Sequence, residues 1–590
     1  MDKNQEVALK QRLLTLAQSG QFVESEKIAL YLLEILPTDL EVWFALAQIQ
    51  RALGKYELAL TAFERVVTKK SINKTQALTS IVELCINLSF FDQGLNAARK
   101  RLKVEPRSAL AHYQFALLSW KLKRINDAAE HFKKAIIFEP KNAKYHLTWA
   151  EVLAFLGDIS GAINQFEHTK LLDPSDDQPY LKSLMFQNYS DELSHEKIYL
   201  NHVEFGQRLE SRYLDVEAFP VRDPKRKIRV AYLSTDFKRH SVSYFFLPIA
   251  QSYEQNMFEL YCYSDMDLNV ADEVTKQLQE LSDSWRDVKL LSDDELYAKI
   301  RHDEIDILVD LTGYAGTSSR MPVFARKAAP IQVTYLGYPN TTGLSRMDYR
   351  IVDKYTDPVD ISESQSSEKL IRLDGGFLCF VPDESSPSVK DLPVDNTGVF
   401  TFGSFNSYLK ITDNTIAAWA EILKQVPDSQ LYVKAEVFVD KGLQNAFVKR
   451  CKSAGIERKR LILAGSTPDR YSHLSEYHKV DLHLDTYPYN GTTTTLEALW
   501  MGVPTVTLAG GSHRSRVGNS ILSNLGLTDF IATTPKEYID IAVAKANDLA
   551  PLKVLRVQCR SIVSNSSLMD KPGFVEGLEC FYAQAVRDLK

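Results

Sequence analysis

Four consecutive threonines, Thr492–Thr495, follow an Asn-Gly pair in the stretch LDTYPYNGTTTTLEALWMGVPTVTL. The residues before the turn and after LEALWMG are strand-like, so the stretch predicts a strand, a turn, a helix and a second strand. The first turn of a helix presents backbone N–H groups without partners inside the helix, and such groups attract anions. Threonine hydroxyls can donate to a phosphate, but they can also simply cap the helix. This stretch alone leaves both interpretations open.

Two other polar turns carry side chains that could act on the same anion. STDFKRHSVSY offers Asp236 and His240, and GSFNSYLKI offers Asn406 and Lys410. A lysine, a turn rich in N–H groups and a nearby histidine suit a negatively charged diphosphate. Each residue taken alone is more commonly an ordinary surface or hydrogen-bonded side chain. All three turns follow predicted strands, however, and this shared position favours a common site.

The elements that must position these turns begin at Ile228. From there, strand-like runs such as IRVAYLS and FELYCYS alternate with helical segments such as DEVTKQLQELSDSW, which predicts parallel α/β sheets. A loop-rich stretch divides the series into two Rossmann-like lobes, at residues 228–390 and 398–590. Open α/β sheets bind ligands beyond the carboxyl ends of their strands, so we expect a cleft between the lobes.

The first third of the chain repeats itself. Pro37, Pro106, Pro140 and Pro174 end similar helical segments, and their spacing fits a period of about 34 residues. This period predicts tetratricopeptide (TPR) repeats, five of them, in an α-solenoid over residues 1–185, with a helical connector at 186–227. Such arrays commonly hold peptides or partner proteins in their groove, and their edges sometimes form homodimers.

Composition narrows the class of protein. The chain has 590 residues, 45% of them hydrophobic and 25% charged, and a net charge of −6, which does not suggest nucleic-acid binding. The amino-terminal residues lack the apolar core of a signal peptide, and no window resembles a membrane span. The six cysteines are scattered without a CxxC pair, so a metal or disulfide framework is not expected. These features predict a cytoplasmic protein.

Five separated strings give the chain a family resemblance. They are STDFKRHSVSYFFLPI, the long segment from DILVDLTGYAG to MDYRIVD, FGSFNSYLKI, HLDTYPYNGTTTTLEALWMGVPTVTL and SRVGNSILSNLGL. Their order and spacing, after a TPR array, resemble the O-linked N-acetylglucosamine transferase family, which includes the plant Spindly proteins. The resemblance covers essentially the whole chain.

The resemblance implies a GT-B glycosyltransferase that inverts configuration and needs neither a metal nor another cofactor. It would transfer a sugar from a nucleotide diphosphate donor, most commonly UDP-N-acetylglucosamine (UDP-GlcNAc), to Ser or Thr of a protein bound along the TPR groove. The leaving diphosphate would then be stabilised by a lysine and helix amides without an arginine.

The resemblance also assigns roles to individual residues. Lys410 takes the place of the family's diphosphate-binding lysine, and Thr493 and Thr494 match the turn that holds the phosphates. His473 corresponds to the histidine that packs on the nucleoside, and Glu497 to the acid that holds the ribose. The remaining donor-side candidates are Ser407, Asn490, Gly491 and Thr492. His240 matches a histidine near the acceptor, where it could be the general base or could orient the sugar.

Three positions depart from the animal members of the family. Thr492 stands where they place histidine, Glu497 where they place aspartate, and Ser407 where they place glutamine. The threonine run with Glu497 is closer to bacterial and Spindly-type members, which include a GDP-fucose user. A GDP-fucose protein O-fucosyltransferase, a UDP-glucose-dependent protein glucosyltransferase and a non-catalytic TPR scaffold that senses nucleotide sugars therefore remain alternatives.

A further group of residues is predicted to border a sugar or acceptor pocket. These are Asp236, Gly313, Tyr314, Tyr338, Pro339, His513 and Arg516. For the turn that contains Tyr338 and Pro339, a purely structural role is the alternative.

Overall fold

The computed structural model describes residues 2–67, 71–213, 215–315, 319–359 and 361–589. Its contacts divide the chain into two compact units. One comprises Met1–Val152 and Leu171–Asp173, and the other Leu153–Lys170 and Pro174–Lys590.

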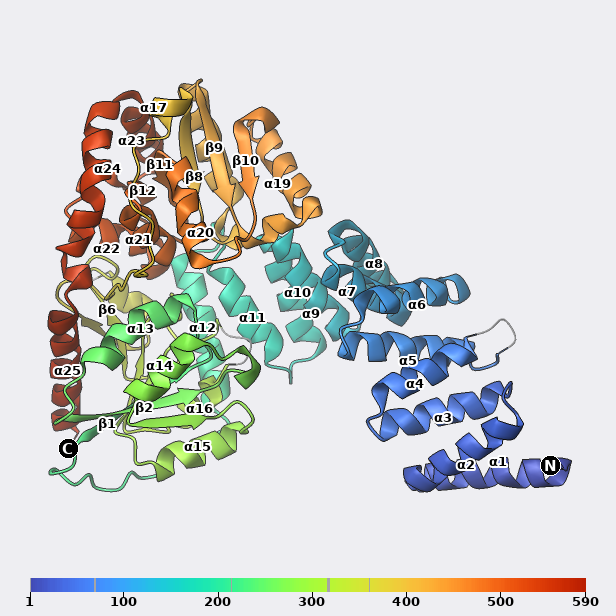
Figure 1. Ribbon diagram of the computed structural model, residues 1–590. Helices are drawn as coiled ribbons and strands as arrows, with labels where there is room; N and C mark the ends of the chain where they lie inside the picture. Colours follow the sequence, from blue (N-terminus) through green and yellow to red (C-terminus); the bar gives the residue numbers. More distant parts are fainter. Residues whose placement is uncertain (1, 68–70, 214, 316–318, 360, 590) are drawn as a thin grey trace. The chain divides into compact units, whose positions relative to one another are not determined.

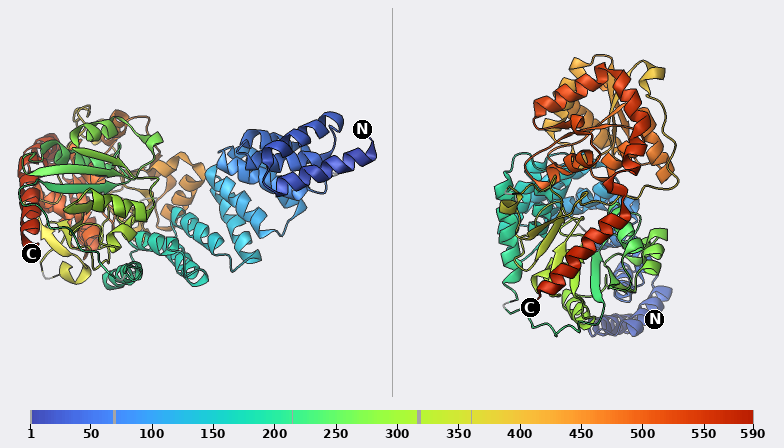
Figure 2. Two further views of the ribbon diagram at one scale, coloured as in Figure 1. Left: turned by 90° about the horizontal axis from the view of Figure 1, so that it is seen from below. Right: turned by 90° about the vertical axis from the view of Figure 1, so that its left-hand side faces the viewer.

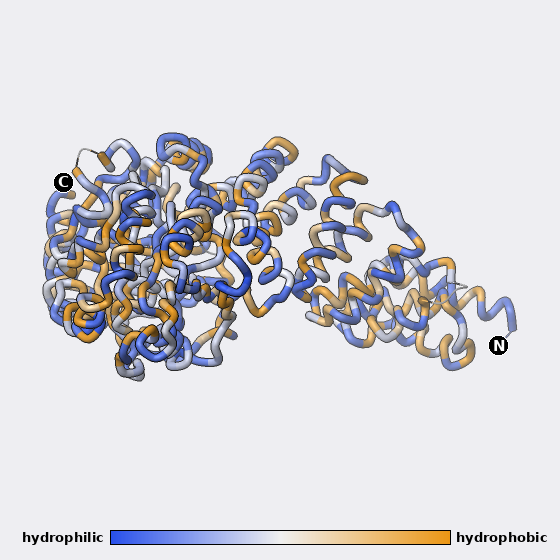
Figure 3. Tube along the Cα trace, turned by 90° about the horizontal axis from the view of Figure 1, so that it is seen from above, coloured by the Kyte–Doolittle hydropathy of each residue, from blue (hydrophilic) through white to orange (hydrophobic). Residues whose placement is uncertain are grey.

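The predicted repeats form successive pairs of antiparallel helices (Figure 1). The helices of the first unit are α1 (Lys3–Gln18), α2 (Phe22–Ile35), α3 (Leu40–Ala52), α4 (Tyr56–Val66), α5 (Lys74–Asn87), α6 (Phe91–Val104), α7 (Ala109–Lys121) and α8 (Ile125–Phe138). Two further helices, α9 (Ala143–Phe155) and α10 (Ile159–Leu172), follow at the same spacing in the sequence. Hydrophobic and hydrophilic residues alternate along these helices (Figure 3), as expected when each pair buries one face against its neighbours.

The turn inside each helix pair requires a left-handed backbone. Gly20, Gly54 and Gly157 adopt φ values of 77°, 73° and 88° at this position. Ser89 and Lys123 occupy the same place in the third and fourth repeats with φ values of 61° and 58°. The repeat geometry thus persists where the glycine is absent, at the cost of some backbone strain.

The second unit begins with helices and continues into a parallel sheet. α11 (Gln178–Gln187) and α12 (His195–Glu210) precede seven strands in the order β3-β2-β1-β4-β5-β6-β7. The strands are β1 (Ile228–Ser234), β2 (Phe258–Ser264), β3 (Ser284–Asp287), β4 (Ile307–Asp310), β5 (Ile331–Thr334), β6 (Tyr349–Val352) and β7 (Lys369–Arg372). All neighbouring pairs are parallel, which confirms the predicted first lobe.

The second lobe contains a six-stranded parallel sheet of order β10-β9-β8-β11-β12-β13. Its strands are β8 (Phe400–Ser404), β9 (Ser429–Lys434), β10 (Leu461–Ala464), β11 (Leu482–Leu484), β12 (Thr505–Leu508) and β13 (Ile531–Ala532). The strand order reverses between β1 and β4 in the first lobe and between β8 and β11 in the second. The predicted polar turns follow β1, β8 and β11, which are the strands at these topological switch points.

Helices cover both sheets (Figure 1). In the first lobe they are α13 (Ser241–Ser252), α14 (Glu273–Leu281), α15 (Asp293–His302) and α16 (Met321–Ala325). A short α17 (Val394–Thr397) precedes β8, and the second lobe adds α18 (Asp413–Gln425), α19 (Lys441–Ser453), α20 (Arg470–Ser475), α21 (Thr493–Trp500), α22 (Val517–Asn524), α23 (Pro535–Asn547) and α24 (Leu549–Ser564).

Three strands of the first lobe differ from the sequence prediction. The segment DEVTKQLQELSDSW was predicted to be one helix, but α14 ends at Leu281 and Ser284 begins β3. β6 and β7 were not predicted at all. Each of the three has only four residues and contains an arginine, so none shows the continuous apolar run or the period of two that identifies a strand.

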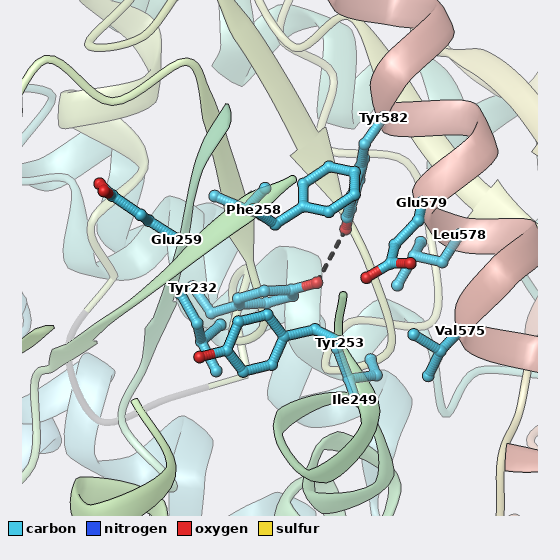
Figure 4. A pocket seen from close by; sticks show the side chains of 11 residues that line it. Tyr232, Ile249, Tyr253, Phe258, Glu259, Val575, Leu578, Glu579 and Tyr582 are labelled. Atoms are coloured by element: carbon cyan, nitrogen blue, oxygen red, sulfur yellow. Dashed lines mark hydrogen bonds between the residues drawn. The ribbon is translucent and has the colours of Figure 1, made fainter. Parts of the chain in front are cut away.

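The last helix, α25 (Lys571–Asp588), returns from the second lobe to pack on the first (Figure 2, right). Its residues Val575, Leu578 and Tyr582 line a small, mostly apolar cavity against β1, β2 and α13 (Figure 4). The hydroxyls of Tyr582 and Tyr232 lie 3.0 Å apart there. The helix thus ties the two lobes together through a packed contact.

Candidate active site between two lobes

The four threonines begin α21, and they do not cap it with their side chains. Thr492 occupies the N-cap position and makes no side-chain cap hydrogen bond. The backbone N–H groups of the first helical turn have no partner within the helix. We call residues 486–494 the anion turn, because this uncapped helix end follows β11 at the switch point of the second lobe.

The threonine hydroxyls nearest the turn hold it in shape. Thr494 Oγ1 donates to Asn406 Oδ1 (2.9 Å), and Thr495 Oγ1 donates to the carbonyl oxygen of Gly491 (3.1 Å). A Cβ on Gly491 would lie 2.4 Å from Thr494 Oγ1 and 2.7 Å from Asn406 Oδ1. Only glycine therefore fits position 491. Thr492 and Thr493 are half-buried.

A buried carboxylate organises the anion turn from below. Asp485 accepts hydrogen bonds from the N–H groups of Gly491 (2.7 Å) and Thr486 (2.9 Å), from Asn406 Nδ2 (3.2 Å) and from Thr507 Oγ1 (2.8 Å). Burial raises the pKa of Asp485 to about 6, although these hydrogen bonds oppose the shift. Sequence reasoning missed this residue. Its position directly after β11 was the available signal.

Lys410 faces the anion turn. Its Nζ donates to the carbonyl oxygen of Asn490 (2.7 Å) and lies 3.9 Å from the ring centroid of Tyr489. Burial lowers the pKa of Lys410 to about 8, with nearby Asp485 opposing the shift. The structure thus brings Lys410, Asn490, Gly491 and the threonines together. Ser407, the residue before the short 3-10 turn that carries Lys410, is exposed.

Two arginines that the sequence analysis did not single out lie near the site. The backbone N–H of Asn490 donates to the carbonyl oxygen of Arg514 (2.9 Å), whose side chain is only 1% exposed. Arg514 Nη2 donates to the carbonyl oxygen of Ser190 (3.4 Å), and burial lowers its pKa to about 10. A second arginine, Arg470, contacts Glu497. Sequence reasoning singled out neither arginine, although Arg514 lies between the candidates His513 and Arg516.

The two residues assigned to the nucleoside lie in direct contact. His473 Nε2 is 3.0 Å from Glu497 Oε2, and Arg470 Nη1 is 2.6 Å from Glu497 Oε1. Burial raises the pKa of Glu497, but the hydrogen bond from His473 and the charge of Arg470 outweigh it and leave the pKa lowered. Arg470 also lies over the ring of Tyr244, 5.1 Å from its centroid. Because Tyr244 belongs to α13, this contact joins the second lobe to the first beside the site.

His240 is the N-cap residue of α13, one turn before Tyr244. Its Nδ1 accepts a hydrogen bond from the N–H of Val242 (3.3 Å) and lies 3.8 Å from Asp236 Oδ2. An Nδ1 that accepts leaves the ring proton of a neutral imidazole on Nε2, which is then a donor. This arrangement suits a histidine that orients a sugar. A general base at Nε2 would require Nδ1 to donate towards Asp236 instead.

The structure corrects the predicted pocket role of several first-lobe residues. Tyr314 and Tyr338 are 4% and 3% exposed in the core that joins the first lobe to α11 and α12. The Tyr314 hydroxyl donates to the carbonyl oxygen of Thr342 (2.6 Å), and the Tyr338 hydroxyl lies 2.7 Å from His202 Nε2. Gly313 packs against Tyr338, and Pro339 is also buried. These residues support the lobe because their polar groups are already satisfied inside it.

His513 and Arg516, which were predicted to border a sugar or acceptor pocket, lie in the seam between the lobes. His513 Nδ1 lies 2.6 Å from Asp357 Oδ2, and both side chains are almost fully buried. Arg516 Nε donates to the carbonyl oxygen of Tyr355 (2.8 Å). The charge of His513 overcomes the effect of burial and lowers the pKa of Asp357 to about 2. The sequence could not show that residues about 160 positions apart form an ion pair.

Among the described residues, no helix is both long and apolar enough to cross a membrane. Within the same ranges, no group of three or more His, Cys, Asp or Glu side chains is arranged to hold a metal ion.

Comparison with known proteins places the chain in a family. The family model described as Glycosyl transferase family 41 matches residues 194–386 and 385–578, and a tetratricopeptide repeat model matches residues 40–68. A solved structure of a Thermobaculum terrenum O-GlcNAc transferase, in which one lysine is replaced by methionine, is 33% identical. It has a TM-score of 0.78 and covers 88% of this chain and 99% of its own.

Curated plant proteins are also similar. The probable UDP-N-acetylglucosamine–peptide N-acetylglucosaminyltransferase SPINDLY of Arabidopsis thaliana is 35% identical over 418 residues, which are 70% of this chain and 45% of that protein. The protein of the same name from Hordeum vulgare is 36% identical over 420 residues, 70% of this chain and 44% of its own. The chain thus spans less than half the length of these relatives. On the matches to its family model and to the solved structure, this chain belongs to glycosyl transferase family 41.

Proposed function

We propose that this protein transfers N-acetylglucosamine from UDP-GlcNAc to Ser or Thr hydroxyls of protein acceptors, with inversion and without a metal ion. The observation that carries the proposal is the pairing of Lys410 with the uncapped amino-terminal end of α21 across the anion turn. Family membership and the activities for which the similar proteins are named support the sugar and the acceptor.

The proposed transfer requires donors that stabilise the negative charge of the departing diphosphate. When an acceptor hydroxyl attacks the anomeric carbon, the bond to the diphosphate breaks and negative charge develops on the leaving oxygen. The Lys410 ammonium and the N–H groups of the anion turn are fixed donors that can stabilise this charge. Each such donor is worth about 3–4 kcal/mol in comparable sites. His473 and Glu497 would hold the nucleoside, and His240 would orient the sugar or the acceptor. The TPR array would bind the acceptor polypeptide.

A second candidate donor is GDP-fucose. Thr492 and Glu497 depart from the histidine and aspartate of the animal members, and the Spindly-type members that they resemble include a GDP-fucose user. UDP-glucose is a third candidate.

A hydrolysis panel of UDP-GlcNAc, UDP-glucose and GDP-fucose tests the donor directly. The proposal predicts the highest kcat/KM for UDP-GlcNAc, and mass spectrometry of acceptor peptides should then locate the sugar on Ser or Thr. Turnover of GDP-fucose and of neither UDP-sugar would contradict the assignment of UDP-GlcNAc as the donor. Binding of a nucleotide sugar without hydrolysis or transfer would instead favour the non-catalytic scaffold.

A further inference from the structure

A row of polar side chains crosses the nucleoside end of the site. It begins at Lys434, the last residue of β9, which is 7% exposed. Lys434 Nζ lies 2.8 Å from His473 Nδ1, and His473 Nε2 lies 3.0 Å from Glu497 Oε2. Lys434 plays no part in the resemblance to the family or in the function proposed above.

The order of donors along this row is fixed by chemistry. A lysine ammonium can only donate, so His473 Nδ1 must accept. The proton of a neutral His473 ring is then on Nε2, where it is donated to Glu497. Lys434 thereby selects one tautomer and one orientation of the His473 ring, because the partner of one ring nitrogen decides the role of the other.

Glu497, at the opposite end of the row, is also fixed by neighbouring side chains. Arg470 Nη1 lies 2.6 Å from Glu497 Oε1, and the Tyr477 hydroxyl lies 3.2 Å from Glu497 Oε2. Glu497 itself is 3% exposed. Its carboxylate is therefore fixed in position by His473 on one side and by Arg470 on the other.

A purely structural role would leave the position of Lys434 unexplained. Within the described ranges, no carboxylate lies at ion-pair distance from its Nζ. Burial lowers the pKa of Lys434, although the charges of Glu476 and Glu497 oppose the shift. A buried ammonium without a carboxylate partner reduces stability, whereas an apolar side chain of similar size would not. The benefit of the lysine must then lie in what its charge does to His473.

We propose that Lys434 is a positioning residue that keeps the nucleoside histidine, His473, neutral and in one tautomer. The inference rests on the proposed function, because His473 and Glu497 are there assigned to the nucleoside. A second proton on the His473 ring would have to bind Nδ1. The Lys434 ammonium group, 2.8 Å away, opposes this because it is already positively charged and donates to the same nitrogen. The other charged or titratable groups around this row are Arg470, Glu476 and Tyr477 of the segment that carries His473, Glu436 after β9, and Tyr244 of α13.

Removing the ammonium should expose the histidine to titration. In Lys434→Met, Nδ1 loses its donor, and the ring beside Glu497 becomes free to protonate and to turn. Nucleotide affinity should then fall and should depend on pH in the range where histidine titrates, around pH 6 to 7. In the parent protein the affinity should change little across that range.

The test is calorimetric binding of UDP and of GDP to the full chain at several pH values between about 5.5 and 8.5. Lys434→Met should weaken the preferred nucleotide about tenfold at neutral pH and add a pH dependence of similar size. Lys434→Arg keeps a donor and should restore a flat profile. In assays of transfer, Lys434→Met should raise KM for the donor while kcat stays within about twofold, because the histidine contributes to ground-state binding.

Lys459→Met is the matched control, since this lysine is 79% exposed and pairs only with surface Glu457 within the described ranges. Thermal unfolding shows whether each variant is folded. If a folded Lys434→Met binds as tightly as the parent with the same pH profile, or if folded Lys434→Arg behaves like Lys434→Met, the inference is wrong. If the parent binds neither UDP nor GDP, the proposed function fails first, and the inference falls with it.

Discussion

Lys410 Nζ lies 2.7 Å from the carbonyl oxygen of Asn490, so the ammonium is held against the anion turn before any substrate contact is considered. Asn406 and Asp485 fix the same turn from the other side. A site whose donors are already in place needs little reorganisation when charge develops on a leaving group. This preorganisation is the physical basis of the predictions that follow.

Replacing Lys410 by methionine should greatly reduce transfer while the protein stays folded. The substitution removes the ammonium and keeps much of the side-chain length, so we expect kcat/KM to fall by a factor of about 100 to 1,000. Steady-state kinetics and thermal unfolding measure the two effects. Lys424→Met, at a lysine that is 77% exposed in the same lobe, should retain parent activity. Parent-like activity of Lys410→Met would remove the ammonium from the mechanism.

Activity should fall at alkaline pH because of Lys410. Burial lowers its pKa to about 8, so the ammonium is present below that pH and is lost as pH rises through it. Since kcat/KM reports groups of the free enzyme, we predict an alkaline limb with an apparent pKa near 8. The control is Lys410→Arg, whose side chain stays charged and should lose this limb if it keeps measurable activity. A parent profile that is flat up to about pH 10, where ordinary lysines titrate, would contradict the assignment.

Asp485→Ala should destabilise the second lobe and weaken nucleotide binding together. The change leaves the N–H groups of Gly491 and Thr486 and the hydroxyl of Thr507 without their acceptor. Each buried donor left without a partner reduces the free energy of unfolding by about 1–3 kcal/mol. A water molecule that hydrogen-bonds to such a donor makes the loss smaller. Chemical denaturation and UDP titration should both report the loss. Tight UDP binding by a destabilised Asp485→Ala would show that the anion turn does not depend on this carboxylate.

The ion pair between Asp357 and His513, in the seam between the lobes, should stabilise the folded protein. His513 lowers the pKa of Asp357 to about 2. The contribution of Asp357 to the free energy of unfolding is therefore present above about pH 4 and is lost as the pH falls towards 2. Asp357→Asn should reduce the free energy of unfolding by about 2–3 kcal/mol at neutral pH. Denaturant unfolding at pH 7 and at about pH 3 should show the difference between parent and variant narrowing at the lower pH. A difference that grows in acid would rule out this ion pair as its source.

Transfer should not require a divalent cation. The proposed donors for the diphosphate are the Lys410 ammonium and backbone N–H groups, so a chelator such as EDTA should leave kcat/KM within about twofold. Adding Mg²⁺ or Mn²⁺ after the chelator is the control. Activity that disappears with EDTA and returns with one cation would show that the diphosphate is held in another way.

Local sequence patterns predicted the repeats, the two lobes and the anion turn because each depends on residues close together in the chain. The period of 34 residues fixes the helix pairs even where Ser89 and Lys123 replace glycine. Lys410 and the threonines were identified from the strands that precede them.

Contacts between distant residues could not be predicted in this way. Asp357 meets His513, and Lys434 meets His473, only because the sheets bring them together. Tyr338 was predicted either to border a pocket or to have a purely structural role, and its hydroxyl is bound inside the core by His202 and Asn188. Whether an aromatic residue after a strand faces a cleft or the core depends on the helices packed beside it.

A structure of the full chain with UDP bound tests the central claim most directly. The account predicts a phosphate oxygen within hydrogen-bonding distance of Lys410 Nζ and of the N–H groups of Thr493 and Thr494, with the ribose beside Glu497. A diphosphate bound away from both Lys410 and the first turn of α21 would contradict it.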